Sequence, residues 1–409
     1  MKFSTAAIIV ITLTTTTLAL AASIPIRMPK GPVKPDSYII KLKSGANLED
    51  HIESITRIST QNPGSKFLVT YRYQILNGYS VYATGTPLSC ILICSEVDYV
   101  EADVTTSSDN DVHHVNERDV AESDDIAVEM EDEDDPVGLK ARVTGQEVMV
   151  FIIATGVFTS HNSLSGDEID EFGQLVPRVA PGPGFGYRYS TLGDEDGLGT
   201  FLAGLAIGIG YSVAPTAMAI SLKVCKSHLN VRSINILKAI EYAYKQFQKT
   251  PELLTIVLIT ANLRYSQAIN DAITLATNHG LYVVVAAGDG RMDASFSSPA
   301  SAPGAITVGA VDCFHNFLSI SNYGPLVDVF ADGFNAQSAW IGRVDAINSL
   351  TGTGPAAARV ASILADALHR AENKQLTPAQ ILRKMQDNAA PVVKGQPEGT
   401  RNYLAQVGW

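Results

Sequence analysis

Hydroxyl and carboxyl side chains with the capacity for catalysis lie in two segments of the C-terminal part of the chain. Thr351 and Thr353 precede a helical pattern, and Asp194, Glu195 and Asp196 form a run of acids just before a glycine. A threonine hydroxyl can attack a carbonyl carbon, but a threonine ahead of a helix more often accepts hydrogen bonds from its first amides. Consecutive acids in a loop usually face solvent. We therefore expect the threonines to cap a helix and the acids to form a solvated surface.

The four cysteines are too few for a disulfide-dense scaffold in 409 residues. Cys90 and Cys94 are four residues apart, which on a helix gives one shared face but poor geometry for a bridge. Cys225 and Cys313 could pair or stay free. The spacing of cysteine and histidine along the chain does not resemble a zinc site, so we expect no metal and no cofactor.

The elements that must position these residues alternate from residue 137 onward. Apolar runs typical of buried strands are VMVFII, AMAISLKV, LLTIVLI, YVVVAA, AITVGAV and VDVFA. Helical patterns fit best at 233–248, 265–279 and 355–372. Continuous apolar strands separated by helices predict an α/β fold with a mostly parallel sheet covered on both faces. In such folds the functional site lies at the carboxyl ends of the strands.

A smaller unit is predicted at 36–104. Its patterns follow the order strand, helix, strand, strand, helix, strand, with the central hairpin turning at Asn77-Gly78. That order is the ferredoxin-like α+β arrangement.

The net charge of −12 is concentrated between the two units. Fifteen acids and one arginine lie between Glu101 and Asp135, so this strip accounts for more than the whole net charge. A nearly neutral remainder argues against a nucleic-acid-binding surface. We interpret 105–136 as a solvated acidic linker.

The first 22 residues have the layout of a secretory signal peptide: Lys2, then an apolar and threonine-rich run, then small residues. No later run is long enough to span a membrane. We therefore expect export, to the extracellular space or to the lumen of the secretory pathway, with the vacuole as one destination.

Six blocks of the sequence resemble, in order, the landmarks of the subtilisin-like serine proteases (peptidase S8) of the proteinase K and cerevisin type. They are VFIIATGVFTSH, DGLGTFLAG, GYSVAPTAMAISLKV, VVVAAGDG with SSPASAPGAITVGAVD, SLTGTGPAAARVA and TRNYLAQVGW. The unit at 36–104 is similar to the inhibitor I9-type propeptide of these enzymes through SYIIKLK and DYVEAD. The resemblance implies a subtilisin-like fold for 137–409.

The resemblance also implies where catalytic residues should stand, and this sequence departs from the family at each position. Ala154 replaces the aspartate that orients the catalytic histidine, Leu198 replaces that histidine, and Gly354 replaces the serine nucleophile. Asp289 replaces the asparagine that donates to the oxyanion. None of the first three can attack a carbonyl carbon, accept a proton or orient an imidazole, and an ionised Asp289 would repel the developing negative charge. His161 follows the first strand as in many relatives and is expected to be structural.

The family's substrate-binding strand usually reads Ser-Leu-Gly-Gly, whereas this chain has Ile259-Thr260-Ala261-Asn262. Ala261 places a Cβ where a glycine lets a peptide approach, so we expect only weak substrate binding at Ala261 and Asn262.

These departures predict a secreted, catalytically inactive homologue, a pseudoprotease that acts as a binding or regulatory scaffold. Two alternatives remain: a propeptide-type inhibitor or folding helper of an active subtilase, and a serine-type endopeptidase with an unorthodox site. A duplicate that decays without a selected role is also compatible with one sequence. The partners expected are an active subtilase, a protease inhibitor or an extended peptide, with no nucleic acid and no membrane. The oligomeric state, calcium binding and the biological ligand stay open.

Overall fold

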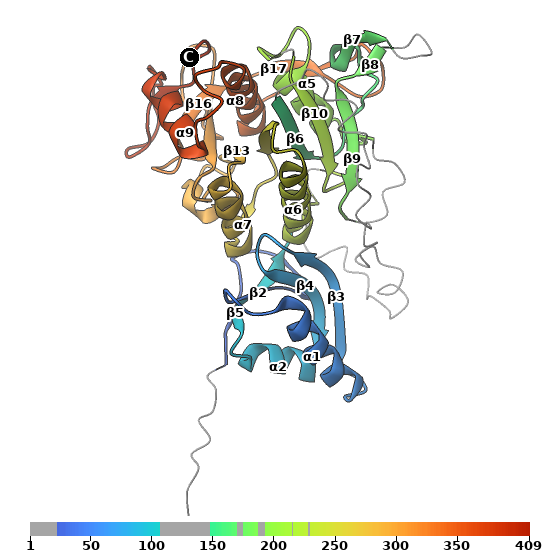
Figure 1. Cartoon of the computed structure of the whole chain (residues 1–409). Coiled ribbons are helices and arrows are strands. Elements are labelled where there is room, and N and C mark those ends of the chain that lie inside the picture. The colour runs from blue at the N-terminus through green and yellow to red at the C-terminus, as the bar shows by residue number, and fades with distance from the viewer. Residues whose placement is uncertain (1–22, 107–147, 170–174, 187–192, 215, 228–229) are drawn as a thin grey trace, which may run out of the picture.

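The computed structural model (Figure 1) describes residues 23–106, 148–169, 175–186, 193–214, 216–227 and 230–409. The expected signal peptide at 1–22 and nearly all of the expected linker at 105–136 lie outside these residues. Two sheets organise the described parts, a five-stranded sheet in residues 23–106 and a nine-stranded sheet in residues 148–409. We refer to these parts as the N-terminal unit and the C-terminal unit.

The N-terminal unit has the element order that its sequence predicts. Its elements are β1 (Ile26–Arg27), β2 (Val33–Leu42), α1 (Leu48–Thr60), β3 (Lys66–Tyr73), β4 (Gly78–Thr84), α2 (Thr86–Ile93) and β5 (Val97–Val104). The sheet order is β1-β5-β2-β4-β3, the ferredoxin-like arrangement with one added strand. Gly78 follows Asn77, whose φ is 47°, and a Cβ at Gly78 would lie 2.3 Å from the carbonyl oxygen of Ile40. The Asn-Gly turn is thus set by sterics.

One face of this sheet carries the helices α1 and α2. The core beneath them contains Ile40, Val81 and Val100 from the strands and Ile52 and Ile55 from α1. The hydrophobic residues of α1 recur at helical spacing, and Asn47 accepts hydrogen bonds from the first amides of the helix. The other face of the sheet is left to pack against the C-terminal unit.

The C-terminal unit is built on the parallel sheet that its apolar runs predict. Its strands are β6 (Val148–Ala154), β9 (Val179–Gly184), β10 (Met218–Lys223), β11 (Leu254–Ile259), β13 (Tyr282–Ala286), β15 (Ile306–Val311), β16 (Val329–Asp332), β19 (Ala390–Pro391) and β20 (Tyr403–Leu404). The order is β19-β20-β16-β15-β13-β11-β6-β10-β9, and only the β19–β20 pair is antiparallel. Because β6 lies between β11 and β10, strand order reverses beside it, where parallel sheets usually bind ligands.

Helices cover both faces of this sheet. α5 (Leu198–Ile207) and α8 (Thr353–Leu368) pack on one face, and α6 (Ser233–Lys249) and α7 (Gln267–Asn278) pack on the other. α8 begins two residues before the predicted start at residue 355 and ends four before the predicted end at 372. The smaller elements are η2 (Asn162–Leu164), η3 (Ala294–Phe296), α9 (Pro378–Asp387), and three two-stranded sheets formed by β7 (Ser165–Ile169) with β8 (Leu175–Pro177), β12 (Leu263–Arg264) with β14 (Ser297–Ser298), and β17 (Ala336–Ala339) with β18 (Ile347–Leu350). No helix in the described part of the chain is long and apolar enough to cross a membrane.

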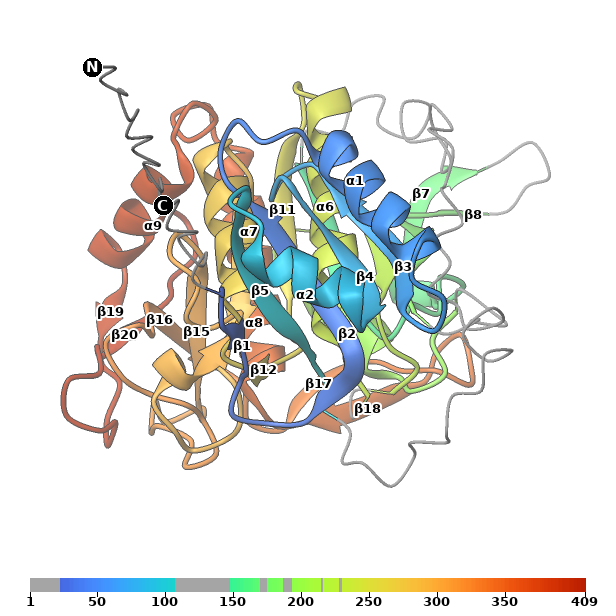
Figure 2. The ribbon, with the colours of Figure 1, turned by 90° about the horizontal axis from the view of Figure 1, so that it is seen from below.

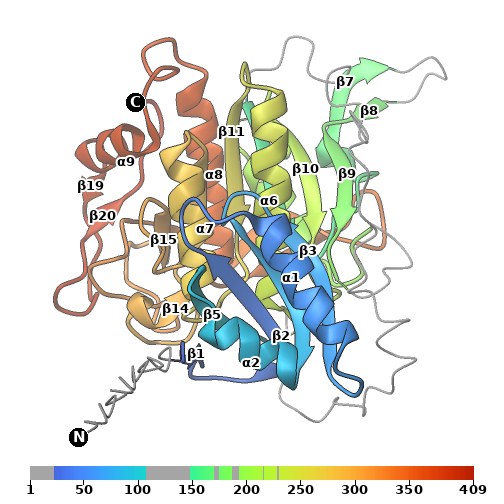
Figure 3. The same ribbon diagram turned by 60° about the horizontal axis from the view of Figure 1, so that its bottom comes forward.

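The N-terminal unit packs its open sheet face onto α6 and α7 (Figures 2 and 3). One hydrophobic cluster crosses the boundary, with Ile39, Tyr73 and Tyr99 on the small sheet and Ile234 and Ile269 on the two helices. The small sheet therefore lies between α1 and α2 on its outer side and α6 and α7 on its inner side.

Candidate functional site

The expected nucleophile position lies at the start of α8, beside the carboxyl ends of β11 and β13. Gly352 precedes the helix with φ 159°, and a Cβ there would lie 2.7 Å from Oδ2 of Asp289. The backbone N–H of Thr353 donates to Oδ1 of Asp289 at 2.8 Å. The carboxylate of Asp289 thus sits at the N-terminus of α8, where the first amides of a helix favour an anion.

The surroundings of Asp289 change the pKa of its carboxyl group. Burial raises the pKa of Asp289 above its ordinary value, and hydrogen bonds from the amide and hydroxyl of Thr353 offset part of that increase. The sequence led us to expect a negative charge that opposes catalysis at this position. Desolvation at the start of α8 therefore favours the protonated carboxyl group more than full hydration would.

Neither threonine caps the helix with its side chain. Thr353 is the first residue of α8, and its Oγ1 accepts the N–H of Gly288 at 3.0 Å. Thr351 Oγ1 accepts the N–H of Asn335 at 2.9 Å. The capping expectation is wrong because Asp289, from a different strand end, takes the amide that a threonine would otherwise have bound.

Gly354 faces Thr260, which belongs to the expected substrate-binding strand. A Cβ at Gly354 would lie 3.7 Å from Cβ of Thr260 and 3.8 Å from Cδ2 of Leu202, which are ordinary contact distances. Oγ1 of Thr260 is buried and has no hydrogen-bond partner among the described residues. A buried hydroxyl without a partner is costly. The position therefore has room for a small side chain and offers one unused polar group.

Ala154 and Leu198 lie at the neighbouring strand end and helix start. Ala154 is the last residue of β6, and Leu198 is the first residue of α5 and packs partly buried on the core that contains Ala154. The hydroxyl of Thr155 accepts the N–H of Gly199 at 2.9 Å, which joins the two elements. Ala154, Leu198, Gly354 and Asp289 thus belong to elements that meet at one end of the sheet, although no direct contact joins all four among the described residues.

The acids before α5 have structural partners. Oδ1 of Asp194 accepts the Thr155 hydroxyl at 2.8 Å and the Gly197 amide at 2.9 Å, and Oδ2 accepts the amide and hydroxyl of Thr200. Asp194 therefore organises the start of α5, and the expectation of a solvated acidic face is wrong for this residue. Glu195 lies 3.7 Å from the ammonium of buried Lys223.

His161 is held by hydrogen bonds at both ring nitrogens. Its Nε2 donates to the carbonyl oxygen of Ala346 at 2.8 Å, and its Nδ1 accepts from Ser163. The ring is buried. Both nitrogens are occupied, as expected of a structural histidine.

The segment after β11 places Asn262 beside Gly288, the residue that precedes Asp289. Nδ2 of Asn262 would lie 2.4 Å from a Cβ at Gly288, and it donates to the carbonyl oxygen of Ala286 at 3.4 Å. The positive φ of Gly288, 99°, and this close approach explain why position 288 needs a glycine.

A separate edge of the C-terminal unit already pairs with extended chain. Thr105 forms an antiparallel bridge with Arg232, and the N–H of Thr106 donates to the carbonyl oxygen of Val231 at 3.0 Å. Val231 and Arg232 lie between β10 and α6. The last described residues of the N-terminal unit therefore run along the C-terminal unit as an added strand does.

Two carboxylates of β5 hold the N-terminal unit on the helices. Both belong to the DYVEAD segment that resembles the propeptide, but their high local acidity predicted a solvated position for them. Asp103 is fully buried and accepts from Arg232 at 2.6 Å, from the Ser233 hydroxyl at 2.8 Å and from the Ile234 amide at 3.3 Å. Glu101 accepts from Ser266 and from the first amides of α7. Each acid thus occupies the N-terminus of one helix.

A reciprocal contact comes from the C-terminal unit. Glu241 of α6 accepts the amides of Gln74 and Ile75 at 2.9 and 3.0 Å. Burial raises the pKa of Glu241, and burial raises the pKa of Glu101 to about 7 because desolvation outweighs its hydrogen bonds.

None of the four cysteines, all of which lie in the described residues, forms a disulfide. Cys225 is buried and Cys313 is exposed. The two that the sequence left open are therefore free thiols.

Comparisons with known proteins identify what this arrangement is similar to. A model of the subtilase family matches residues 145–409. The cuticle-degrading serine protease of Arthrobotrys oligospora is 30% identical over 390 residues, covering 91% of this chain and 91% of that protein. Subtilisin-like protease 1 of Pseudogymnoascus destructans is 28% identical over 421 residues, covering 100% of this chain and 99% of that protein.

Two further similarities are limited to part of the chain. Subtilisin-like protease 3 of Pseudogymnoascus destructans is 33% identical over 262 residues, 64% of this chain, and the chain spans only 62% of that relative's length. The crystal structure of a cold adapted subtilisin-like serine proteinase superposes with a TM-score of 0.55 at 27% identity, covering 64% of this chain and 88% of that one.

These relatives contradict the expectation of a catalytically inactive scaffold that is not an enzyme. All three are named as proteases, and the solved structure is that of a serine proteinase. The prediction of a catalytically inactive scaffold is therefore wrong.

Proposed function

Because this chain belongs to the subtilase family, we propose that it is a secreted endopeptidase that cuts extended polypeptides through an unorthodox site. The observation that supports this most directly is the position of the Asp289 carboxylate at the N-terminus of α8, inside the region that matches the family. The family's catalytic positions are occupied by Ala154, Leu198 and Gly354. These residues take no part in the proposed proton transfer.

Asp289 is the general base of the proposed reaction. Thr260 needs a hydrogen-bond partner, and a water molecule between its hydroxyl and Gly354 would supply one. Asp289 accepts a proton from this water as the water oxygen bonds to the peptide carbonyl carbon and the carbonyl electron pair moves to its oxygen. The backbone N–H of Gly354 at the start of α8, which Asp289 does not bind, stabilises that oxygen. The C–N bond then breaks, and Asp289 returns the proton to the leaving amine.

The peptide lies along the edge formed by Val231 and Arg232. Thr105 and Thr106 already pair with this edge through the backbone, which supports its ability to bind extended chain regardless of side chain. Ala261 and Asn262 contribute the weaker contacts.

The N-terminal unit serves as a propeptide of the inhibitor type. Its carboxylates Asp103 and Glu101 hold it on α6 and α7, and its last described residues occupy the peptide edge. Residues 1–22 direct secretion. Active enzyme therefore requires that the chain be cut after the N-terminal unit.

The test measures peptide-bond hydrolysis by the full secreted chain and by a form cut at a specific site introduced within 107–136. The substrates are an unfolded protein and a quenched peptide library, and intact mass records any cleavage of the chain by itself. We expect turnover after the cut, and a loss of about 10²-fold or more in Asp289→Asn, the lower range for removal of a general base. Asp345→Asn, an exposed acid paired with Arg343, is the matched control.

Two further measurements make the test specific. Gly354→Ala fits the fold because the nearest atom is 3.7 Å from the new Cβ, but it should displace the water and lower kcat. Because burial raises the pKa of Asp289, activity should fall on the acid side at a higher pH than an ordinary aspartate would dictate. The absence of turnover in both forms of the chain, or full activity in Asp289→Asn, would refute the proposal.

A further inference from the structure

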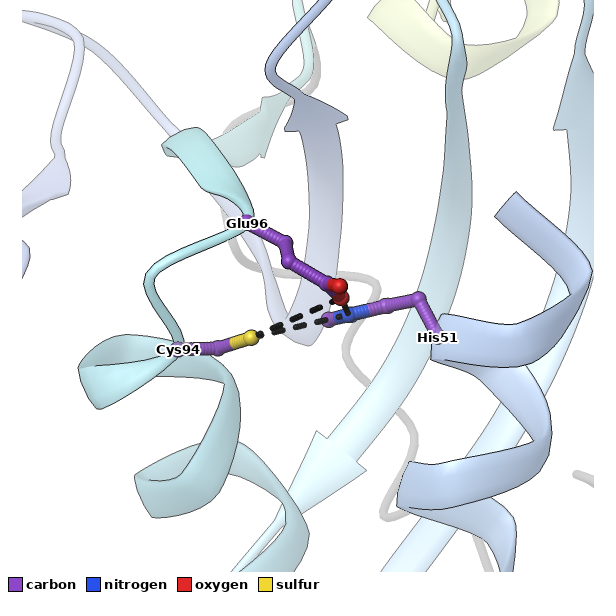
Figure 4. Close-up of side chains that lie close together, drawn as sticks. All are labelled: His51, Cys94 and Glu96. Atoms are coloured by element: carbon purple, nitrogen blue, oxygen red, sulfur yellow. Dashed lines mark hydrogen bonds and ion pairs between the residues drawn. The ribbon is translucent and has the colours of Figure 1, made fainter. Parts of the chain in front are cut away.

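Three side chains of different chemistry meet in the N-terminal unit, far from the site at α8. His51 lies in the first turn of α1, Cys94 is the residue that ends α2, and Glu96 lies between α2 and β5 (Figure 4). Each offers one atom that can bind a metal, and the three atoms lie within 4.8 Å of one another. Cys94 and Glu96 are close in the chain, but His51 is 43 residues away, which is why spacing alone predicted no zinc site.

The separations fit the edges of a zinc tetrahedron. Nδ1 of His51 is 3.3 Å from Oε2 of Glu96 and 3.7 Å from Sγ of Cys94, and that sulfur is 4.0 Å from the same carboxylate oxygen. Zinc bonds of about 2.0 Å to nitrogen and oxygen and about 2.3 Å to sulfur place tetrahedral ligands roughly 3.3–3.6 Å apart. Small side-chain rotations close the remaining gap.

We propose that His51, Cys94 and Glu96 bind a divalent zinc ion, with water as the fourth ligand. A thiolate, an imidazole and a carboxylate are all common zinc ligands, whereas calcium and magnesium prefer oxygen alone. This proposal is independent of the proposed peptidase function.

The imidazole is already oriented for this role. Nε2 of His51 lies 3.1 Å from the hydroxyl of Tyr79 on β4, and both side chains are buried. A hydrogen bond at one ring nitrogen fixes the tautomer and leaves the other nitrogen free to bind metal, as histidine ligands in proteins usually require. Tyr79 therefore positions the ligand without touching the metal.

Zinc bound at this position would connect three parts of the N-terminal unit. It would join the start of α1 to the end of α2 and to the turn that leads into β5, the strand that carries Glu101 and Asp103. A metal that binds only the folded state stabilises that state by mass action. Zinc should therefore stabilise the N-terminal unit and its five-stranded sheet.

The experiment titrates the purified full chain, reduced and free of metal, with cobalt and then with zinc. Tetrahedral cobalt bound to a thiolate gives intense visible bands and a charge-transfer band in the near ultraviolet, and zinc should abolish them by displacement. Native mass spectrometry counts the zinc, and thermal unfolding measures its effect. We expect one ion per chain and a higher Tm with zinc.

The cysteines provide matched variants. Cys94→Ser should abolish the thiolate band and the Tm increase, and Glu96→Gln should weaken binding by at least tenfold. Cys90→Ser, one helical turn earlier and also half-buried, and Cys313→Ser, the exposed thiol of the other unit, should bind as the unchanged chain does. No thiolate band in the unchanged chain, or a band that survives Cys94→Ser or disappears in Cys313→Ser, would overturn the proposal.

Discussion

Removal of the Asp103 carboxylate tests how the two units are held together. Asp103 is fully buried, and besides Arg232, Ser233 and Ile234 it also accepts from the hydroxyl of Ser37 at 3.2 Å. In Asp103→Ala the guanidinium of Arg232, whose side chain is only 17% exposed, loses its buried counter-charge. Removing one partner of a buried pair costs about 3–5 kcal/mol. If this cost is lost from the free energy of docking, the equilibrium constant for separation of the two units rises roughly a hundred- to a few-thousand-fold.

Hydrogen exchange of the full chain measures this separation at amides that Asp103 does not touch. The N–H groups of Gln74 and Ile75 donate to Glu241 across the boundary and should exchange faster in the variant. Val284, in the central strand β13, is the reference for the C-terminal unit itself and should keep its protection. The two sites together separate undocking from global unfolding.

Asp98→Ala is the control because it removes an acid from the same strand. Its side chain is 45% exposed and lies 3.8 Å from Lys41, so its loss should cost at most about 1 kcal/mol, or about a fivefold change. Unchanged exchange at Gln74 and Ile75 in Asp103→Ala would show that the buried carboxylate does not hold the units together. Equal acceleration at Val284 would show that the variant unfolds the C-terminal unit instead.

Two other predictions concern the boundary and the start of α5. Burial raises the pKa of Glu101 from its ordinary value of 4.5 to about 7. Docking should therefore be strongest below about pH 4.5 and weaken as the pH rises to about 7, by up to ~3 kcal/mol. Burial also raises the pKa of Glu241, so this residue acts in the same direction. In Glu101→Gln the change in hydrogen exchange at the Gln74 amide with pH should therefore become less steep without disappearing. An unaltered pH dependence would exclude Glu101 as the cause. Gly199→Ala should lower the free energy of unfolding by roughly 1–3 kcal/mol, because its Cβ would lie 1.9 Å from the carbonyl oxygen of Gly156. Gly354→Ala, which has room for a Cβ, should leave that free energy unchanged or raise it slightly. A denaturant titration in which Gly354→Ala is the less stable of the two would contradict this steric argument.

The sequence by itself predicted the main sheet and the order of elements in the N-terminal unit. The strands β6, β10, β11 and β13 are continuous apolar runs, which only a sheet covered on both faces can bury. The order of strands and helices around the Asn77-Gly78 turn likewise follows from local patterns. These features depend on periodicity and turn chemistry, which are properties of neighbouring residues.

Only the tertiary structure decided which polar residues meet. Asp103 belongs to an acidic strip in the sequence, yet it is buried at the start of α6, and Asp289 reaches the start of α8 from another strand end. His51 and Cys94 are 43 residues apart and lie 3.7 Å from each other. A local sequence pattern predicts that an acidic residue faces solvent. Its actual contacts depend on long-range packing, because the residues that bind a helix N-terminus or a metal ion can come from distant parts of the chain.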